Sequence, residues 1–332
     1  MNNKKCIGCG SILQNEDKTK IGYTPLKINS KTNYCERCFK ITHYNEKLIV
    51  NLNNINEYII REVNKKSKYV FFMIDLLNIN EETLNTFKKI NCDKTLIISK
   101  LDIIPKSIKD NIIIEWLKEE YNIEENIIFL STKKNINTRQ LNKILETNKI
   151  SEAYILGYTN AGKSTLINKI CEQNDIKNRE ITTSILPNTT IDFITIQINE
   201  NIKLIDSPGF VQEQSIYSED EFELMKNILP KNTIKPMTEQ TKENTILKIA
   251  DKIIIKPKSK NSFTFYLSNT LKIEKTFKKE EYHNIEAKEY NIKPNSDIVI
   301  KGIGFVNIKK ECKIEILCKD HNLIEIRNSM FK

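Results

Sequence analysis

Short apolar runs alternate with amphipathic stretches through the middle of the chain. Four runs are nearly continuous in apolar residues, as strands covered on both faces of a parallel sheet are: Tyr69–Asp75, Thr95–Ile98, Ile127–Leu130 and Ala153–Leu156. Helical periodicity predicts helices from about Pro105 to Tyr121, near Thr138–Asn148 and over Ser164–Asn174. This alternation predicts a doubly wound α/β sheet, in which ligands bind at the carboxyl ends of the strands.

The pattern changes beyond the last of these helices. Ile191–Ile198 and Ile202–Ile205 predict a β-hairpin, and Ser262–Leu267, Ile298–Ile308 and Glu311–Cys318 predict further strands. We therefore expect a small β-rich α+β domain in the C-terminal part. The predicted domains are residues 1–47, 48–215 and 216–332, and a chain of 332 residues has the length for two or three domains.

The strand Ala153–Leu156 runs into a glycine-rich segment, Gly157–Ser164, which fits the phosphate-binding pattern G-x-x-x-x-G-K-[ST] at every fixed position. Backbone N–H groups at the start of the following helix attract anions. Lys163 is expected to reach the β- and γ-phosphates, and the Ser164 hydroxyl to bind Mg²⁺. A chance glycine-rich turn is the alternative, opposed by the strand before it and the helix after it. The predicted nucleotide contacts here are Gly157, Asn160, Ala161, Gly162, Lys163, Ser164 and Thr165.

A second phosphate-side motif follows the predicted hairpin. Asp206-Ser207-Pro208-Gly209 is a D-x-x-G at the end of an apolar strand, 43 residues beyond Lys163. The carboxylate of Asp206 can hold Mg²⁺, and the N–H of Gly209 can meet a γ-phosphate. The D-x-x-G pattern alone is weak evidence for a phosphate-side motif. Its placement after this apolar strand makes the evidence strong.

Recognition of guanine requires a carboxylate, because N1–H and the exocyclic amino group are adjacent donors that a two-oxygen acceptor satisfies together. Asp102, in Ser99-Lys100-Leu101-Asp102, is predicted to be that carboxylate, with Lys100 against the base. The segment resembles the N-K-x-D motif of guanine-nucleotide-binding proteins, and Ser131-Thr132-Lys133 resembles their S-A-K base loop. Ser99 is shorter than the usual Asn, so we expect weaker affinity with discrimination retained. Adenine lacks the donor pair, which opposes a metabolic P-loop kinase or ATPase.

The first residues carry two C-x-x-C pairs, Cys6 with Cys9 and Cys35 with Cys38, separated by 25 residues. Four thiolates in two pairs suit a closed, tetrahedral structural Zn²⁺ site whose metal supplies folding energy. Redox-active pairs or disulfides are the alternative. No hydrophobic signal segment precedes the cysteines, which predicts a cytoplasmic chain with reduced thiols. No apolar run is long enough to span a bilayer, so no membrane partner is expected.

The formal charge of +9 is concentrated in one stretch, because residues 226–279 hold 13 lysines against 4 acidic residues and the remainder is balanced. A polyanion-binding surface and a solvated lysine face both fit this charge. Phe263, Phe265 and Tyr266 lie in the same stretch and fit stacking on RNA, but each also fits a core strand.

The base-reading motif precedes the phosphate loop, the reverse of the ordinary order, and a Cys₄ module precedes both. This arrangement resembles the circularly permuted GTPases of ribosome assembly, most closely the YqeH family. Several stretches carry the resemblance over nearly the whole chain: Gly22–Pro25, Tyr34–Phe39, His43–Glu46, Ser99–Ser107 and Asp297–Phe305. Permutation is tolerable because the termini of a domain often lie close together. The resemblance implies a circularly permuted P-loop GTPase domain of the α/β class, an N-terminal zinc module and a C-terminal domain that binds RNA.

The resemblance also implies roles for single residues. The family's P-G-T-T switch motif stands here as Pro187-Asn188-Thr189-Thr190, so Thr190 matches the Mg²⁺-coordinating threonine and Asn188 stiffens the turn. Phe210 stands where Ras-like enzymes have a water-orienting glutamine, so hydrolysis of GTP to GDP is expected to be slow. Asn160 would hold K⁺, which neutralises charge between the phosphates. The expected catalytic residues are Lys163, Thr190, Asp206 and Asn160.

The expected function is a GTP-hydrolysing switch in assembly of the small ribosomal subunit, binding GTP or GDP, Mg²⁺, Zn²⁺ and K⁺. Ribosomal RNA or a small-subunit precursor is the expected partner, and DNA is not. Because Gly209 and Phe210 run within a short span into the C-terminal segment, nucleotide state has a covalent route to the orientation of that segment. The alternative is a nucleotide-regulated RNA-binding module with a non-ribosomal target and little hydrolysis.

Overall fold

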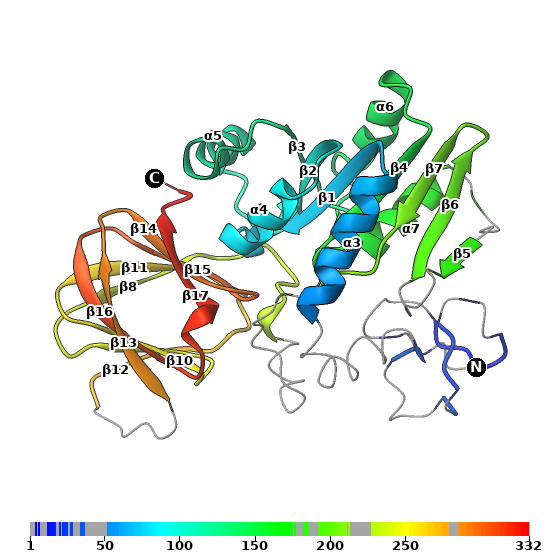
Figure 1. Cartoon of the computed structure of the whole chain (residues 1–332). Coiled ribbons are helices and arrows are strands. Elements are labelled where there is room, and N and C mark those ends of the chain that lie inside the picture. The colour runs from blue at the N-terminus through cyan, green and yellow to red at the C-terminus, as the bar shows by residue number, and fades with distance from the viewer. Residues whose placement is uncertain are drawn as a thin grey trace.

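A computed structural model of the chain (Figure 1) describes residues 52–174, 192–210, 227–278 and 285–331, with 4, 6, 12–17, 20, 22–25, 27, 28, 34–36, 176, 182–185 and 212. A seven-stranded sheet has the order β3-β2-β1-β4-β7-β6-β5. Its strands are β1 (Tyr69–Asp75), β2 (Asp93–Ser99), β3 (Asn126–Phe129), β4 (Glu152–Gly157), β5 (Thr182–Ile185), β6 (Asp192–Asn199) and β7 (Ile202–Asp206). Neighbours from β3 to β7 pair in parallel, whereas β6 pairs antiparallel with β7 and with β5. The predicted strands and the predicted hairpin are confirmed.

Helices cover both faces of this sheet, as the apolar runs predicted. One face packs against α3 (Leu52–Lys66), α4 (Glu81–Lys88) and α5 (Asp110–Tyr121), and the other against α6 (Gln140–Thr147) and α7 (Lys163–Gln173). Successive residues of β1 show the division, because Phe72 packs with the α4 residue Phe87 while Phe71 belongs to the core beneath α6 and α7. The α5 helix begins at Asp110 rather than near Pro105, because a turn in which the N–H of Ile108 donates to the oxygen of Pro105 precedes it.

The C-terminal part is a β-sandwich of two five-stranded sheets, ordered β12-β9-β10-β16-β13 and β17-β14-β15-β11-β8. The strands are β8 (Met237–Thr241), β9 (Ile246–Ile249), β10 (Ile253–Pro257), β11 (Asn261–Tyr266), β12 (Ile273–Thr276), β13 (Glu286–Ile292), β14 (Ser296–Ile300), β15 (Gly304–Ile308), β16 (Cys312–Cys318) and β17 (Ile324–Asn328). Within residues 231–278 and 285–331 the one helical element is the 3₁₀ turn His321–Leu323, so the β-rich character expected of this part is confirmed.

The run Ile298–Ile308, predicted as a single strand, forms the hairpin of β14 and β15. Its turn needs glycines, because Gly302 has a φ of 84° and Gly304 a φ of 143°. A Cβ on Gly304 would lie 2.4 Å from the carbonyl oxygen of Tyr266 on β11, so neighbouring backbone occupies the place of a side chain. The sequence signal for this turn is Lys301-Gly302, which interrupts the apolar run.

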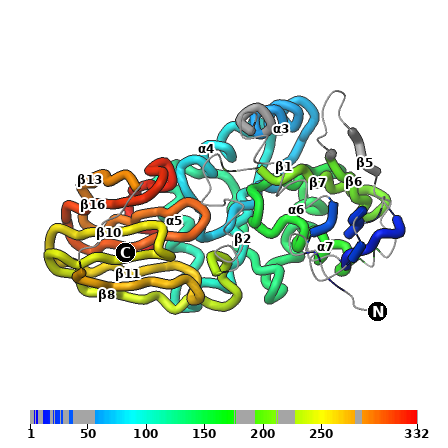
Figure 2. Tube along the Cα trace, turned by 90° about the horizontal axis from the view of Figure 1, so that it is seen from below, coloured from blue at the N-terminus to red at the C-terminus, as the bar shows by residue number. Residues whose placement is uncertain are grey.

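The sandwich packs against α4 and α5, which lie between it and the parallel strands (Figures 1 and 2). Arg327 on β17 is 5% exposed and donates to the backbone oxygen of Ile79, which precedes α4. Its guanidinium lies 4.6 Å from the ring centroid of Trp116 on α5 and 3.5 Å from the carboxylate of Asp297. The Trp116 indole N–H donates to the backbone oxygen of Asn328 at 3.1 Å. The two parts therefore meet in a buried polar and aromatic interface.

Candidate nucleotide-binding site

The phosphate loop joins the carboxyl end of β4 to the amino end of α7, as predicted. Gly157 has a φ of 152°, and a Cβ there would lie 2.4 Å from the carbonyl oxygen of Met73 on β1, so glycine is required. Asn160 and Gly162 have φ values of 66° and 93°, in the left-handed range, just before the helix. The residue that precedes α7 is Gly162, which has no side chain to cap the helix, and the N–H groups at a helix amino end attract anions.

The D-x-x-G segment is hydrogen-bonded directly to this loop. The N–H of Phe210 donates to the oxygen of Gly157 at 3.0 Å, and the N–H of Thr159 donates to the oxygen of Phe210 at 2.9 Å. Gly209 lies so near the loop that a Cβ on it would be 3.1 Å from the Thr159 hydroxyl and 3.4 Å from the Lys163 ammonium. The glycine expected to sense a γ-phosphate thus lies beside the lysine expected to bind that phosphate.

Two of the three predicted Mg²⁺ ligands lie on adjacent elements. Ser164 is the second residue of α7, and Asp206 ends β7, where it is 5% exposed and aligns with Ile155 of β4. Hydroxyl and carboxylate oxygens at the carboxyl edge of a parallel sheet suit Mg²⁺. The third predicted ligand, Thr190, lies outside the described residues, as does Asn188.

The predicted base-reading residues follow β2 and β3. The Ser131 hydroxyl donates to the Asp102 carboxylate at 2.5 Å, and the N–H of Leu101 donates to the oxygen of Leu130 at 3.0 Å. These contacts hold the 3₁₀ turn after β2, Leu101–Ile103, against the loop after β3. Asp102 therefore lies with the S-T-K loop, of which Thr132 is half-buried and Lys133 is exposed.

Ser99 connects the base-reading segment to the phosphate loop. Its hydroxyl lies 2.7 Å from the backbone oxygen of Ala161 and 3.2 Å from that of Ile74, with one hydrogen to donate between them. The sequence led us to expect that a side chain shorter than Asn would lose contacts here. The structure shows that Ser99, which is 2% exposed, still reaches the phosphate loop because β2 and the loop approach closely.

One functional candidate, Asp75, was missed in the sequence. The ammonium of Lys100, which stands in the left-handed region with a φ of 61°, forms an ion pair with the Asp75 carboxylate at the end of β1. The same carboxylate accepts from the N–H of Leu77 at 3.0 Å. The available signal was an acidic residue directly after a buried strand, the same signal that identified Asp206.

Phe210 belongs to the core and is fully buried, with its ring 5.7 Å from the rings of both Phe72 and Tyr158. A ring held in this way cannot orient water, which agrees with the sequence analysis. Nearby, Gln212 is 9% exposed, and its side-chain oxygen accepts from the amide nitrogen of Asn78 at 3.1 Å. Neither of these amides was singled out in the sequence.

Of the three aromatic residues that fitted either RNA stacking or a core strand, two lie in the core. Phe263 and Phe265 are 0% and 1% exposed in the sandwich core, so the core alternative holds for both. Tyr266 is half-buried, with its ring stacked 4.8 Å from that of Phe305. Phe277, just after β12, is instead 52% exposed, and the Lys242 ammonium lies 5.0 Å from its ring centroid.

Half of the predicted zinc site can be described. Cys6 and Cys35 are 1% and 3% exposed in a small core with Leu13, and the N–H of Cys35 donates to the Cys6 sulfur at 3.2 Å. The chain thus brings together one cysteine from each C-x-x-C pair. Cys9 and Cys38 lie outside the described residues.

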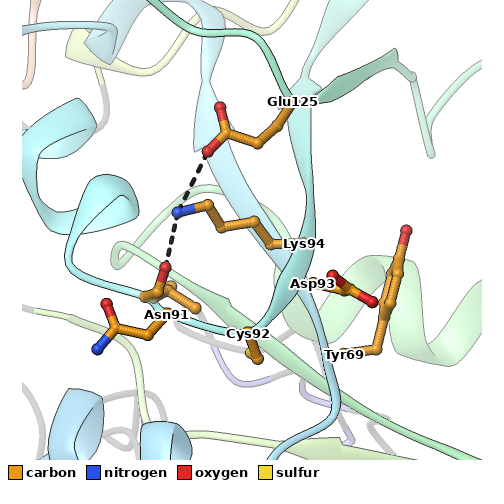
Figure 3. A pocket seen from close by; sticks show the side chains of 7 residues that line it. Tyr69, Asn91, Cys92, Asp93, Lys94 and Glu125 are labelled. Atoms are coloured by element: carbon orange, nitrogen blue, oxygen red, sulfur yellow. Dashed lines mark hydrogen bonds and ion pairs between the residues drawn. The ribbon is translucent and has the colours of Figure 1, made fainter.

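A hollow at the opposite, amino edge of the sheet is a separate feature (Figure 3). It is lined by Tyr69, Ile90, Asn91, Cys92, Asp93, Lys94 and Glu125. Its one cation, Lys94, lies 3.2 Å from the Glu125 carboxylate and donates to the oxygen of Ile90 at 2.7 Å, so it is already satisfied. Burial raises the pKa of the Cys92 thiol, which disfavours the reactive thiolate.

No helix within the described residues has the length and apolar character needed to cross a bilayer. Residues 152–269 match the protein family described as 50S ribosome-binding GTPase. That match begins with β4 and includes the phosphate loop and the D-x-x-G segment. Fold, site and family match together define a P-loop GTPase domain joined to a β-rich C-terminal part.

The similarity to individual proteins extends further along the chain. YqeH of Bacillus subtilis is 28% identical over 337 residues, covering 91% of this chain and 92% of YqeH. The chloroplastic/mitochondrial NO-associated protein 1 of Arabidopsis thaliana is 24% identical over 315 residues, covering 81% of this chain and 54% of that protein. GTPase Der of Buchnera aphidicola is 32% identical over 204 residues, covering 58% of this chain and 38% of Der. The resemblance to the YqeH family is thereby confirmed.

Proposed function

We propose that this chain is a cytoplasmic GTP-hydrolysing switch that acts on a ribosomal subunit precursor, with nucleotide state controlling RNA binding by the C-terminal part. One observation carries the proposal: the Ser99 hydroxyl lies 2.7 Å from the Ala161 oxygen, joining the base-reading segment to the phosphate loop. Asp102 and Lys163 therefore lie along the same carboxyl edge of the sheet. The Asp102 carboxylate at one end of this edge suits the guanine base of GTP, and Lys163 at the other end suits its phosphates.

We further propose that the GTPase domain is circularly permuted. Strands β1 to β3, which carry the base-reading motifs, precede β4, which carries the phosphate loop. The family match begins only at residue 152, after all of those motifs. In space β1 nevertheless pairs in parallel with both β2 and β4, so one continuous sheet holds both halves of the site. The proposed division remains residues 1–47, 48–215 and 216–332.

Hydrolysis in this proposal depends on cations because Phe210 cannot orient water. Mg²⁺ would be held by Ser164, Asp206 and Thr190, and K⁺ by Asn160, whose side chain is exposed on the loop in a left-handed backbone conformation. When bound, K⁺ supplies positive charge between the phosphates. Exposure of the amide fits a weakly bound, exchangeable ion.

The K⁺ role predicts faster turnover of GTP in K⁺ than in Na⁺ at equal ionic strength, by roughly tenfold if the cation replaces part of an arginine finger. Phosphate release measured in the two buffers tests it. Asn160→Ala should abolish the difference, whereas the control Asn201→Ala, in the exposed β6–β7 turn, should retain it. Equal rates in both buffers, or stimulation that survives in Asn160→Ala, would contradict the role.

For RNA we propose the surface around Phe277. The exposed ring with Lys242 above it offers a face on which a base can stack, and Lys278 adds a nearby exposed cation. Lys275 is fixed close by, donating to Glu239 at 3.0 Å and to the oxygen of Gln240 at 2.6 Å. The concentration of lysines over residues 226–279 favours an anionic partner.

For the N-terminal part we propose a structural Zn²⁺ held by Cys6, Cys9, Cys35 and Cys38. The contact between Cys6 and Cys35 supports it, because two C-x-x-C pairs must meet to enclose one ion. Among the described residues of this part, Leu13 and the two cysteines are buried with Ile28 and Tyr34 against them, and metal binding would add stability to this core. The group is structural, and no step of hydrolysis involves it.

Co-sedimentation with purified ribosomal subunits tests the proposed function. The protein loaded with a non-hydrolysable GTP analogue should sediment with one subunit at moderate salt, and the GDP-loaded protein should not. Separate small- and large-subunit fractions distinguish the small-subunit expectation from the 50S named in the family description. Phe277→Ala should weaken sedimentation several-fold, whereas Ile112→Ala, an exposed apolar residue 43% accessible on α5, should not. Sedimentation in no nucleotide state would refute the ribosomal role, and RNA binding without it would favour a non-ribosomal target.

A further inference from the structure

The segment after the D-x-x-G motif contacts more than the phosphate loop. Gln212 lies three residues beyond Gly209 and is 9% exposed. Its side-chain oxygen accepts from the amide nitrogen of Asn78 at 3.1 Å, while no described residue accepts from its own buried amide nitrogen. A buried donor without such a partner is costly. The described contacts therefore hold Gln212 on one side only, in a position that a shift of the segment can change.

Asn78 joins Gln212 to the C-terminal sandwich. It ends the 3₁₀ turn Leu76–Asn78, which follows β1 in the GTPase region. While its amide nitrogen donates to Gln212, its side-chain oxygen accepts from the N–H of Gly302 at 3.1 Å. Gly302 lies in the turn between β14 and β15. One side chain thus bonds to the segment after D-x-x-G through its nitrogen and to the sandwich through its oxygen.

Asn78 is held in place by the start of α4. The Asn80 amide nitrogen donates to the side-chain oxygen of Asn78 at 3.1 Å and to its backbone oxygen at 2.9 Å, and the Thr83 hydroxyl also reaches that backbone oxygen, at 3.1 Å. Asn80 and Thr83 themselves form the capping box of α4. These contacts hold the backbone of Asn78 in place, so its side-chain amide is the part that can respond to Gln212.

The turn on the other side is a discrete element. Gly302 has a φ of 84°, and the ammonium of its neighbour Lys301 lies 3.4 Å from the Glu82 carboxylate on α4. The N–H of Lys301 donates to the oxygen of Leu323, next to β17. A change at Gly302 therefore acts on the two strands, β14 and β17, that face the GTPase region.

We propose that Asn78 is a positioning residue that couples the segment after Gly209 to the β14–β15 turn, so that the sandwich responds to the presence of a γ-phosphate. The coupling rests on the proposed GTP binding. A phosphate at Lys163 displaces or draws in Gly209, which lies against that lysine. Phe210 is hydrogen-bonded to the loop, and Gln212 follows two residues later. When Gln212 moves, Asn78 loses or regains the acceptor for its amide nitrogen, and its hold on Gly302 changes with it.

Hydrogen exchange of the full-length protein, bound to GDP or to a non-hydrolysable GTP analogue, tests the coupling. In the unmodified chain the amides of residues 300–304 should exchange at rates that differ between the two states by roughly fivefold, the effect of one hydrogen bond. Asn78→Asp replaces the donor toward Gln212 with an oxygen and keeps an acceptor for Gly302. Gln212→Met removes the acceptor from the other side. Gln212→Met should abolish the difference between the nucleotide states, whereas Asn78→Asp, to which a turned Gln212 amide can donate, should reduce it.

The matched control is Asn64→Asp. Asn64 also donates through its amide nitrogen, to the oxygen of Lys89 at 2.9 Å, and accepts from the N–H of Asn91 at 3.0 Å, away from the nucleotide site. The Asn64→Asp variant should keep the difference in exchange rate between the two nucleotide states. Equal exchange in both states of the unmodified chain, or a difference that keeps its full size in Asn78→Asp and Gln212→Met, would overturn the coupling. Binding of a fluorescent GDP is measured in parallel, because failure to bind nucleotide refutes the proposed function rather than the coupling.

Discussion

At the base end of the site, a serine in place of the usual asparagine still contacts the phosphate loop. Ser99 is shorter than asparagine, yet its hydroxyl reaches the oxygen of Ala161 at 2.7 Å because the strand end and the phosphate loop lie close together. Asp102 accepts from Ser131, which orients the carboxylate. We propose that guanine selection depends on Asp102, and that Ser99 positions the loop rather than reading the base.

This division predicts the effect of Asp102→Asn. The change places an amide donor opposite the donors of guanine, so affinity for GDP should fall roughly 100-fold, the loss of a charge-assisted hydrogen bond with a repulsive contact added. Affinity for xanthosine diphosphate should rise, because xanthine has an acceptor oxygen at position 2. Titration with fluorescent nucleotides measures both. Asp93→Asn, at the exposed amino end of the same strand, is the control. Unchanged guanine preference in Asp102→Asn would remove this residue from the base site.

Among the elements, those with a strong local pattern were predictable. The buried strands β1, β2 and β4 follow from nearly continuous apolar runs, and the phosphate loop follows from glycines that local backbone geometry requires. Gly157 illustrates this point, because the oxygen of Met73 would lie 2.4 Å from a Cβ there. Where neighbouring backbone approaches this closely, glycine is required, and the glycine can be recognised in the sequence.

Elements and contacts that depend on distant segments were not predictable. The sequence could not show that Phe263 and Phe265 face the sandwich core, because alternation fits a core strand and an RNA-binding strand equally well. The β14–β15 turn was missed although Lys301, Gly302 and Gly304 mark it in the sequence. Asn78 and Gln212 are 134 positions apart, so no local pattern relates them. Asp75 could have been found, since it ends a buried strand as Asp206 does.

The relation between the two halves of the molecule depends on a few buried polar contacts. Glu325 on β17 accepts from the N–H of Glu81, the first residue of α4, at 3.0 and 3.1 Å, and from the Tyr121 hydroxyl at 3.2 Å. A carboxylate at a helix amino end is favourable. Burial is nevertheless the largest influence and raises the pKa of Glu325 above its ordinary value of 4.5, although Glu81, Arg327, Tyr121 and Lys301 oppose the rise.

A raised pKa makes docking of the halves depend on pH in a definite direction. Between 4.5 and the folded pKa of Glu325, the folded protein holds a proton that the unfolded chain has released. The contribution of Glu325 to stability is therefore fully present below pH 4.5 and is lost as pH rises through the folded value. The effect amounts to about 1.4 kcal/mol for each unit by which the two pKa values differ.

Comparison of the unmodified chain with Glu325→Gln isolates this effect, because glutamine cannot titrate but retains an acceptor for the N–H of Glu81. The single tryptophan, Trp116, contacts Asn328 and Arg327 across the interface, so its fluorescence reports undocking during urea denaturation. As pH falls from 7.5 towards 4.5, we expect the unmodified chain to gain stability relative to Glu325→Gln. Glu289→Gln, on the exposed part of β13, should show no such relative change. A stability difference that stays constant across this range would mean that Glu325 remains charged in the docked molecule, and that its contact with α4 outweighs the cost of burial.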